Sequence, residues 1–338
     1  MIHISNERDP VFNIALEEWF FRNRPDDQTD LFLYGNPPSV IVGRNQNPWM
    51  ECDLGYVGQR GIGFARRVSG GGAVYHDEGN LNVSVSMPRQ AYDPSHVVGL
   101  VREALAALGI ESAECERHAL WVDGLKILGS AYALTGRSAL SHVCVLVDSD
   151  LSELRRCLRP VTAGLTGKST RSVPASVTDL ASRCPGFDTA ALQRTILAVF
   201  ETHHGAAETR EWSTADLGRT PGLGVLLAKH RGWEWVFGRT PSFAHDLGQV
   251  EDGLTSRMIL EVKKGYVSGV SLAGTDGAGE GAWGLEDLWR GLPYDGTTLA
   301  RAASGEPPCV GDGSSEGVLC VAARLAQQIP NTLELIAG

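Results

Sequence analysis

A glycine-rich run with paired arginines offers the clearest chemistry in the chain. Arg66 and Arg67 precede Gly70–Gly72, and His76 and Asp77 follow a few residues later. Glycine lets a backbone approach a ligand closely, so that successive N–H groups form an anion-binding concavity, and arginine adds a fixed fork of donors. We therefore expect a phosphate- or carboxylate-bearing ligand here. The alternative is a hairpin turn with exposed charges, which needs neither the arginine pair nor the trailing His-Asp.

Two familiar glycine-rich motifs do not fit the run. A Walker-type phosphate loop needs Lys-Ser or Lys-Thr directly after its last glycine, but Gly72 is followed by Ala73 and Val74. The dinucleotide-binding fingerprint lies between a strand and a helix, whereas this run leads into residues 81–86, which alternate with the strand period. We therefore predict that the glycine loop, defined as residues 69–73, joins strand to strand.

A lysine among small residues is the second candidate for chemistry. Strand alternation is expected to place Lys126 on the opposite side from Leu125 and Ile127, and Gly129 to Ala131 follow it. A lysine flanked by small residues has room for a ligand, although a solvent-facing strand lysine is a common structural residue. The presence of the glycine loop in the same chain favours the functional interpretation.

Composition limits the class of protein. A chain of 338 residues with 43% hydrophobic content can bury a large core, and we expect two domains. The net charge of −10 argues against a nucleic-acid partner. No apolar stretch approaches the roughly 20 residues needed to cross a bilayer, and no targeting segment precedes Ile2, so that any organellar presequence would have to be missing from this chain. The seven scattered cysteines predict reduced thiols rather than disulfides or a zinc site.

Periodicity and capping residues predict the elements that position these groups. Asp9 and Pro10 begin an apolar-periodic helix, and Asp123-Gly124 predicts a hairpin turn. The composition changes after Phe243, so we expect a small α/β appendage of about 90 residues. Helices are expected at 10–21, 97–108, from Asp150, and at 190–200, 285–289 and 318–328; strands at 31–34, 40–43, 120–122, 125–128, 143–147, 256–262 and 266–272; flexible loops at 274–281 and 311–317.

Four ordered blocks carry a family resemblance. They are GRNQNPWMEC at 43–52, the run at 66–80, KILGSAY at 126–132 and STRSVPASV at 169–177. With these blocks the chain resembles the lipoate-protein ligases and mitochondrial lipoyltransferases. The resemblance implies an α/β (α+β) fold. It consists of a biotinyl/lipoyl-protein-ligase-like catalytic domain with mixed sheets flanked by helices, at residues 1–247, and a small C-terminal α/β accessory domain at 248–338.

The resemblance also implies the reaction. ATP activates lipoate as lipoyl-adenylate (lipoyl-AMP), and the acyl group then passes to one lysine of a lipoyl-carrier domain. Lys126 corresponds to the catalytic lysine, whose ammonium can neutralise charge that builds as the mixed anhydride forms or breaks. Binding of lipoate, ATP or lipoyl-adenylate is implied for Arg66, Arg67, Gly71, Gly72, Ala73, Val74, Tyr75, His76, Arg117, Ser130, Ala131 and Thr170.

Further roles are expected around this site. Thr170 corresponds to a loop that closes over the adenylate and excludes water. Val42, Ala73 and Ala131 are candidates for an apolar slot for the lipoyl tail. His76 and His142 are candidate general bases, although the favoured interpretation is a strand-end histidine that is hydrogen-bonded to the backbone. Asn80 and Asp77 are expected to brace the glycine loop.

The chain departs from the family pattern in two places. Ala119 stands where an aspartate is usual, so a carboxylate expected near the nucleotide or its Mg²⁺ is absent. Ser141-His142-Val143-Cys144 replaces the usual His-His-Gly-Thr. We therefore expect ATP and Mg²⁺ as cofactors of an activation step that is less secure than acyl transfer.

Alternatives remain open. One is an octanoyltransferase of the same superfamily with Cys115 or Cys144 as the acyl carrier, although Cys144 fits a buried small hydrophobe better. Another is a degenerate module that binds a carrier or adenylate without turnover, and biotin ligase is a less fitting relative. Expected partners are the apo lipoyl domains of 2-oxoacid dehydrogenase complexes and the glycine-cleavage H protein. We expect a monomer without nucleic acid or membrane, in the mitochondrial matrix if the source is eukaryotic and otherwise cytoplasmic.

Overall fold

The computed structural model describes residues 1–115, 117–249, 257–273, 283–304 and 322–336. The chain divides into two compact units. The first comprises Met1–Arg44, Ile62–Leu158 and Ser172–Arg231, and the second comprises Asn45–Gly61, Arg159–Arg171 and Gly232–Gly338. This division differs from the predicted boundary after residue 247, because two earlier segments group with the C-terminal part of the chain.

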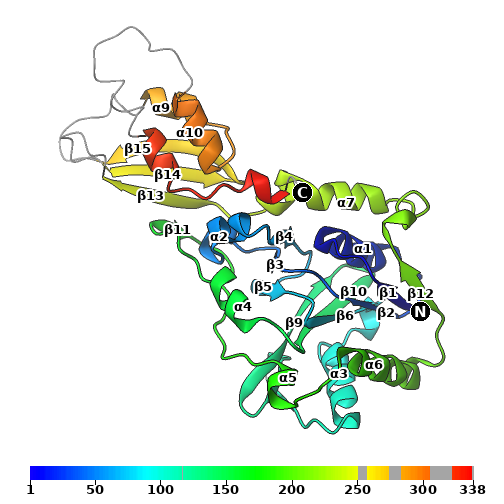
Figure 1. Cartoon of the computed structure of the whole chain (residues 1–338). Helices are drawn as coiled ribbons and strands as arrows, with labels where there is room; N and C mark the ends of the chain where they lie inside the picture. The colour runs from blue at the N-terminus through cyan, green and yellow to red at the C-terminus, as the bar shows by residue number, and fades with distance from the viewer. Residues whose placement is uncertain (116, 250–256, 274–282, 305–321, 337–338) are drawn as a thin grey trace. The chain divides into compact units, whose positions relative to one another are not determined.

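A mixed eight-stranded sheet is the centre of the first unit (Figure 1). The sheet combines parallel and antiparallel pairing, since β1 (Ile2–Ser5) is parallel to β2 (Asp30–Tyr34) and β2 is antiparallel to β6 (Asn80–Pro88). In spatial order the strands are β12 (Thr209–Trp212), β1 (Ile2–Ser5), β2 (Asp30–Tyr34), β6 (Asn80–Pro88), β10 (Ser138–Leu146), β9 (Leu125–Leu134), β8 (Leu120–Val122) and β7 (Ala113–Glu114).

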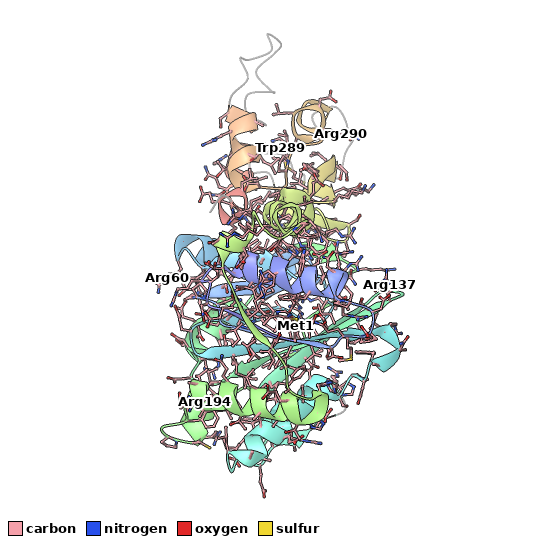
Figure 2. All side chains as sticks on the ribbon, turned by 90° about the vertical axis from the view of Figure 1, so that its right-hand side faces the viewer. Met1, Arg60, Arg137, Arg194, Trp289 and Arg290 are labelled. Carbon is pink, nitrogen blue, oxygen red and sulfur yellow. The ribbon has the colours of Figure 1, made fainter. Side chains whose placement is uncertain are left out.

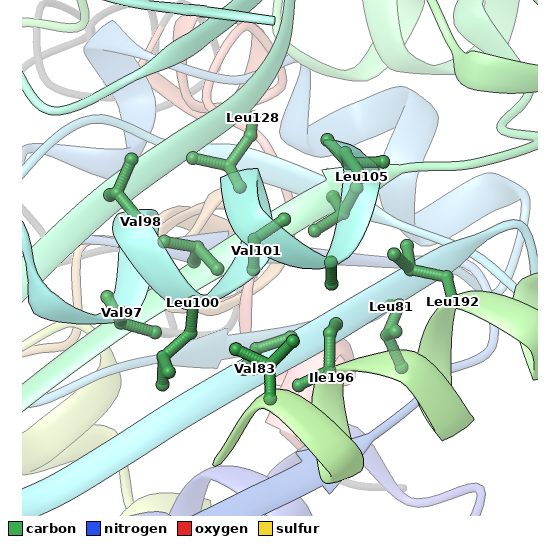
Figure 3. Close-up of a cluster of buried hydrophobic side chains, with 14 of the residues drawn as sticks. Leu81, Val83, Val97, Val98, Leu100, Val101, Leu105, Leu128, Leu192 and Ile196 are labelled. Atoms are coloured by element: carbon green, nitrogen blue, oxygen red, sulfur yellow. The ribbon is translucent and has the colours of Figure 1, made fainter. Parts of the chain in front are cut away.

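Helices cover both faces of this sheet. The helices α3 (His96–Ala107) and α6 (Thr189–His204) lie together on one face, and α1 (Pro10–Asn23) with α7 (Leu223–Arg231) lies on the other (Figure 1). Figure 3 shows the core under α3, where Val97, Val101 and Leu105 approach Leu128 of β9 and Ile196 of α6. These side chains are almost completely buried, so this face is closed by packing.

Local signals explain where several elements begin and end. The Asp9 side chain accepts a hydrogen bond from the Val11 N–H, and Pro10 occupies the first turn of α1. Helix α3 ends before Gly109, which has a φ of +80°. Asp123 and Gly124 have φ values of 50° and 73° in the turn between β8 and β9, as a two-residue type I′ hairpin requires. The helices predicted at 10–21, 97–108, from Asp150, at 190–200 and at 285–289 and this hairpin are therefore confirmed, whereas the helix predicted at 318–328 is described only from residue 322 and ends at residue 326.

The glycine loop belongs to a second, smaller sheet of the first unit. Strand β3 (Ser39–Val42) pairs in parallel with β4 (Gly63–Arg66) and antiparallel with β5 (Val74–His76). The glycine loop connects β4 to β5, so the strand-to-strand prediction is confirmed. The other elements of this unit are η2 (Arg89–Ala91), α4 (Leu151–Cys157), α5 (Leu180–Arg183) and η3 (Thr214–Asp216).

The hairpin between β9 and β10 extends to the edge of the first unit. Figure 2 shows Arg137 at its tip, where the guanidinium pairs with Asp26 at 2.5 Å.

Within the described ranges, no helix is long and apolar enough to cross a membrane.

The second unit is built around a four-stranded antiparallel sheet in the order β11 (Leu165–Gly167), β13 (Phe243–Gln249), β14 (Arg257–Lys263) and β15 (Tyr266–Ala273). Trp49 is fully buried there, and its ring lies 5.2 Å from that of Phe237 and 5.1 Å from that of Tyr294. The other elements are η1 (Pro48–Met50), α2 (Leu54–Gln59), α8 (Trp233–Val236), α9 (Trp283–Trp289), α10 (Gly296–Ser304), a helical segment at 322–326 and η4 (Leu333–Ile336). The predicted β14–β15 hairpin is confirmed, whereas the loops predicted at 274–281 and 311–317 lie outside the described residues.

Candidate functional site

A β-bulge sets the direction of the Lys126 side chain. On β8, Leu120 and Trp121 are consecutive, but they pair with Leu128 and Lys126 of β9, so Ile127 is an extra residue in its strand. Bulges of this kind re-aim a side chain. Lys126 stays on the predicted side, opposite the buried Ile127, but alternation breaks after Ile127: Ile127 and Leu128 are both buried, and Lys126 shares a face with Gly129 and Ala131.

The Lys126 ammonium lies over a glycine. A Cβ atom at Gly129 would stand 3.2 Å from Lys126 Nζ, so the absent side chain at that position leaves room for the lysine. Burial lowers the pKa of Lys126, and the nearby Arg117 guanidinium lowers it further. Among the described residues, the ammonium has no hydrogen bond or ion pair, whereas the Lys126 backbone bonds Ser176 and Thr178. A half-buried cation without a partner is suited to an anionic ligand.

Arg67 holds the glycine loop in place. Its Nη2 atom donates to the carbonyls of Gly70 at 2.6 Å and Gly72 at 2.7 Å, and its Nε atom donates to Ser69 Oγ at 2.9 Å. Nη1 donates to the Ile41 carbonyl at 3.0 Å. Burial lowers the pKa of Arg67 to about 10, which leaves it charged at neutral pH. In this structure the predicted ligand-binding arginine is thus a brace beneath the loop.

The loop itself keeps donors available. The Gly70 N–H donates to the Tyr132 carbonyl and the Ala73 N–H to Ser172 Oγ, but the N–H groups of Gly71 and Gly72 have no partner among the described residues. Gly71 has a φ of +84°, and a Cβ there would stand 3.4 Å from the Ala131 side chain. The two free N–H groups therefore fit a phosphate or carboxylate oxygen.

A buried hydrogen-bonded chain connects helix α1 to Arg67. Glu17 Oε1 lies 2.8 Å from His142 Nδ1, and His142 Nε2 lies 2.8 Å from Ser69 Oγ. Because Arg67 Nε donates to this hydroxyl, Ser69 can donate to His142 Nε2, and His142 can donate from Nδ1 to the Glu17 carboxylate. His142 therefore bonds side chains, and the prediction of a backbone partner for it is wrong.

A second chain from α1 reaches the neighbouring arginine. Glu18 Oε2 lies 2.6 Å from His230 Nε2, and His230 Nδ1 lies 3.2 Å from the Arg66 carbonyl oxygen. The Arg66 side chain is fully buried and donates to the Gly43 and Arg44 carbonyls at 3.0 and 3.1 Å. The structure therefore gives Arg66 a structural place at the end of β4, not an exposed donor position.

His76 and its neighbours have different partners from those predicted. His76 Nδ1 lies 2.9 Å from Asn36 Nδ2, so its partner is also a side chain. Burial and the nearby Arg67 charge lower the pKa of His76 to about 3, so its imidazole is neutral at physiological pH. Asp77 and Asn80 bond the Gly79 N–H and Ser149, respectively, and thus brace the turn after β5, not the glycine loop.

Two cationic groups meet near Cys115. Arg117 is exposed, its charge acts on Lys126, and its guanidinium has no partner among the described residues. Burial would raise the pKa of the Cys115 thiol, but the N–H groups of Arg117 and Ala119 and the Lys126 charge lower it. Burial raises the pKa of Cys144 to about 12, which favours its interpretation as an unreactive thiol. Ala119 is 3% exposed and contributes no carboxylate.

The remaining predicted residues divide between the two units. Ala73 is the last residue of the glycine loop, and the Ala131 side chain lies beside Gly71 of the loop. Val74 is half-buried, and Tyr75 and Val42 are buried. Alternation turns Ser130 away from the face of Ala131. Thr170 is exposed in the second unit, where its N–H donates to the Asn45 carbonyl at 3.2 Å. The structure brings Lys126, Arg117 and Ala131 to one region of the first unit.

Two polar residues that the sequence did not indicate also belong to this face. Asn82 pairs with Cys144, which in turn pairs with Gly129, so alternation places all three on the Lys126 side of the sheet. Asn82 Nδ2 and Glu17 Oε2 are buried and have no hydrogen-bond partner among the residues that the structure describes. Unpaired buried polar atoms are costly, so each calls for an explanation, and a bound ligand is one that fits the face beside Lys126. The signal in the sequence was Asn82 itself, a polar residue at an inward-facing strand position.

The donors present fit an anionic group such as a phosphate better than a protein-held metal ion. The free N–H groups of Gly71 and Gly72 suit phosphate oxygens. The described part of the chain contains no group of three or more His, Cys, Asp or Glu side chains that could hold a metal ion. With Ala119 in place of a carboxylate, the residues here do not fit Mg²⁺ bound through the protein.

The fold and the sequence both match known proteins. Plasmodium falciparum LipL1 in complex with lipoate is 19% identical, with 97% of this chain and 99% of that chain covered and a TM-score of 0.64. A bipartite lipoate protein ligase, described with its E2 lipoyl domain from Thermoplasma acidophilum, is 24% identical over 70% of this chain and 94% of that chain, with a TM-score of 0.58. Lipoate-protein ligase A bound with ATP is 24% identical, with 68% of this chain and 92% of that chain covered and a TM-score of 0.55.

These structures share the α/β fold with mixed sheets flanked by helices. The family model of the lipoyl protein ligase A/B catalytic domain matches residues 9–201, which contain the glycine loop, Arg117 and Lys126. The chain therefore belongs to the lipoyl protein ligase A/B family.

Proposed function

We propose that this protein attaches lipoyl groups, by way of lipoyl-adenylate, to a lysine of lipoyl-carrier domains. The observation that carries the proposal is the half-buried Lys126 ammonium, which lies over Gly129 and lacks a partner among the described residues. An acyl-adenylate presents a carbonyl and an α-phosphate side by side, and both develop negative charge during acyl transfer. A fixed ammonium between them stabilises both.

Each group of the site has a role in this reaction. In the first step the lipoate carboxylate attacks the α-phosphate of ATP and pyrophosphate leaves. In the second, the carrier lysine amine attacks the acyl carbonyl, an amide forms and AMP leaves. The N–H groups of Gly71 and Gly72 bind a phosphate oxygen, Lys126 neutralises the oxygen that gains charge, and Arg117 adds a second cation.

We propose that acyl transfer is the stronger of the two half-reactions. Ala119, directly before β8, leaves this position without a carboxylate that would help to hold Mg²⁺. Transfer from a preformed adenylate needs no metal-bound triphosphate, so it is unaffected by that absence. ATP, Mg²⁺ and lipoate are the reagents to test for activation. The carriers proposed are the E2 lipoyl domains of 2-oxoacid dehydrogenase complexes and H protein, served by a monomer in the mitochondrial matrix if the source is eukaryotic.

The decisive experiment compares two donors. The protein is incubated with an apo lipoyl domain and either lipoate, ATP and Mg²⁺ or preformed lipoyl-adenylate, and the carrier mass is measured. We expect a lipoyl mass shift with the adenylate and a slower one with free lipoate. Lys126→Ala should reduce both by at least about 100-fold. Equal labelling rates from the two donors would contradict the proposed preference for acyl transfer. If neither donor labels the carrier but the protein still binds lipoyl-adenylate, the protein is a non-catalytic binding module.

A second candidate function rests on Cys115. The thiol lies near Lys126 and has a lowered pKa, which favours a thiolate that could carry an acyl group in an octanoyltransferase. Incubation with an octanoyl carrier and intact-mass analysis would show an octanoyl thioester. Its disappearance in Cys115→Ser would support this function, and the absence of any thioester would exclude it.

A further inference from the structure

Asn82 on β6 carries a buried amide whose Nδ2 atom has no hydrogen-bond partner in the part of the chain that the structure describes. The residue is 3% exposed. A buried donor left unpaired costs stability, so such a group persists where a ligand satisfies it. The same holds for Glu17 Oε2, which lies on α1 over the same face of the sheet.

Asn80 on the same strand shows what a structural asparagine does here. It lies two residues away and is 2% exposed, but its Nδ2 atom donates to Ser149 Oγ at 2.6 Å and its Oδ1 accepts from the Asp77 N–H at 2.6 Å. Both polar atoms of Asn80 are therefore used by the fold. The two asparagines are almost equally buried, so what distinguishes them is that the fold satisfies the amide of Asn80 and not the Nδ2 atom of Asn82.

Asn82 stands across the sheet from Lys126. Gly129, under the lysine ammonium, pairs with Cys144, and Cys144 pairs with Asn82. Two strand spacings of about 4.8 Å separate Gly129 from Asn82, or roughly 10 Å. An extended eight-carbon chain built from bonds of about 1.5 Å spans roughly 9 Å. An acyl group whose carbonyl meets Lys126 can therefore reach Asn82 with its far end.

The two ends of this face differ in burial. On the Lys126 side Arg117 is exposed, which suits the charged nucleotide, whereas Tyr34 beside Asn82 is 4% exposed. An apolar acyl chain gains free energy when it runs toward the buried end. At that end a lipoyl group presents two ring sulfurs, which are weak acceptors, and an octanoyl group presents a methyl group.

We propose that the Asn82 amide donates to the dithiolane sulfur and selects lipoyl over octanoyl groups. The inference rests on the proposed function, since it places the acyl carbonyl at Lys126. Octanoate would leave the buried donor unpaired, and a site with an unpaired donor rejects the analogue that lacks the acceptor.

The test compares Asn82→Leu, which keeps the shape and removes both polar atoms, with Asn80→Leu as the matched control. Calorimetry measures binding of lipoate and of octanoate to the full chain without ATP or carrier, and thermal unfolding measures stability. We expect the lipoate preference of the wild type to fall about 10-fold in Asn82→Leu, with an unchanged or higher Tm. Asn80→Leu should lower the Tm and keep the preference. Asn82→Ala repeats the test with a smaller side chain.

Three results would overturn the inference. An unchanged preference in both Asn82 variants would mean that the amide does not contact the acyl end. An equal loss of both acids would mean that Asn82 supports the site without selecting between them. A wild-type protein that binds neither acid and forms no product would overturn the proposed function, and the inference with it.

Discussion

The ammonium of Lys126 lies directly over Gly129, with Nζ 3.2 Å from the position that a Cβ atom there would take. The atoms that a new methyl group would meet are the far end of the lysine side chain, not backbone. The glycine thus permits the position of the cation, and a methyl group would move the cation by a few tenths of an ångström or more.

Gly129→Ala is expected to separate positioning from stability. Alanine in a strand interior stabilises relative to glycine by roughly 0.5–1 kcal/mol, so the Tm should stay equal or rise. Acyl transfer from lipoyl-adenylate should fall roughly 10- to 100-fold, because the ammonium is displaced from the reacting atoms. Gly99→Ala on α3, where no atom lies within 4 Å of a new Cβ, is the control and should leave transfer unchanged. Full activity in Gly129→Ala would show that the lysine position is not critical.

Arg67→Lys should destabilise the protein strongly. Lysine keeps the charge but cannot reproduce the bonds from Nε, Nη1 and Nη2 to Ser69 and the loop carbonyls. We expect a loss of about 3 kcal/mol in the free energy of unfolding, measured by urea titration. Arg60→Lys, an exposed position, serves as the control. An equal loss in the free energy of unfolding in both variants would contradict the bracing role.

The pairing of Glu18 with His230 should make the free energy of unfolding depend on pH in the acid range. Burial opposes ionisation of Glu18, but the bonds from His230 and Lys229 outweigh it and lower its pKa from 4.5 to about 2. The carboxylate therefore stabilises the fold fully above pH 4.5, and this contribution is lost as the pH falls toward 2. In Glu18→Gln the free energy of unfolding should be lower at pH 7 and should lose less between pH 5 and pH 3. Glu208→Gln, an exposed site, should follow the wild type.

His76 should not titrate in the functional pH range. Its folded pKa of about 3 lies below the ordinary value of 6.5, so the unfolded chain binds a proton that the folded chain excludes. This difference costs stability as the pH falls from 6.5 toward 3. The NMR ring resonances of His76 should stay constant between pH 5 and pH 8. In His76→Gln the pH–rate profile of acyl transfer should keep the wild-type shape, even if the rate itself is lower. A His76 titration near pH 6.5 would contradict its burial as a neutral imidazole.

Local signals in the sequence predicted much of the fold. Asp9 and Pro10 fixed the start of α1, Asp123-Gly124 fixed the hairpin before Lys126, and the strand-like residues after Gly72 identified the strand-to-strand loop. Each of these features depends on residues close together in the chain. The grouping of Asn45–Gly61 and Arg159–Arg171 with the C-terminal part depends on distant contacts, which local patterns do not encode.

The site was predicted less completely. Lys126 was identified, but its direction depends on the extra residue Ile127, whose only trace in the sequence is a pair of adjacent apolar residues where alternation predicts one. Arg67 has the right chemistry for a ligand, yet backbone carbonyls that only the folded loop presents occupy its donors. Asn82 could not be told from Asn80 by residue type, because the distinction lies in which partners the tertiary structure supplies.

Consecutive carboxylates on α1 fix consecutive arginines far along the chain. Glu17 reaches Arg67 through His142 and Ser69, and Glu18 reaches the Arg66 carbonyl through His230. Exchange of one member of either chain removes a buried bond of its neighbour, so single substitutions are penalised and paired ones tolerated. Among homologues we therefore expect Glu17 to covary with His142, and Glu18 with His230, as two separate inherited pairs.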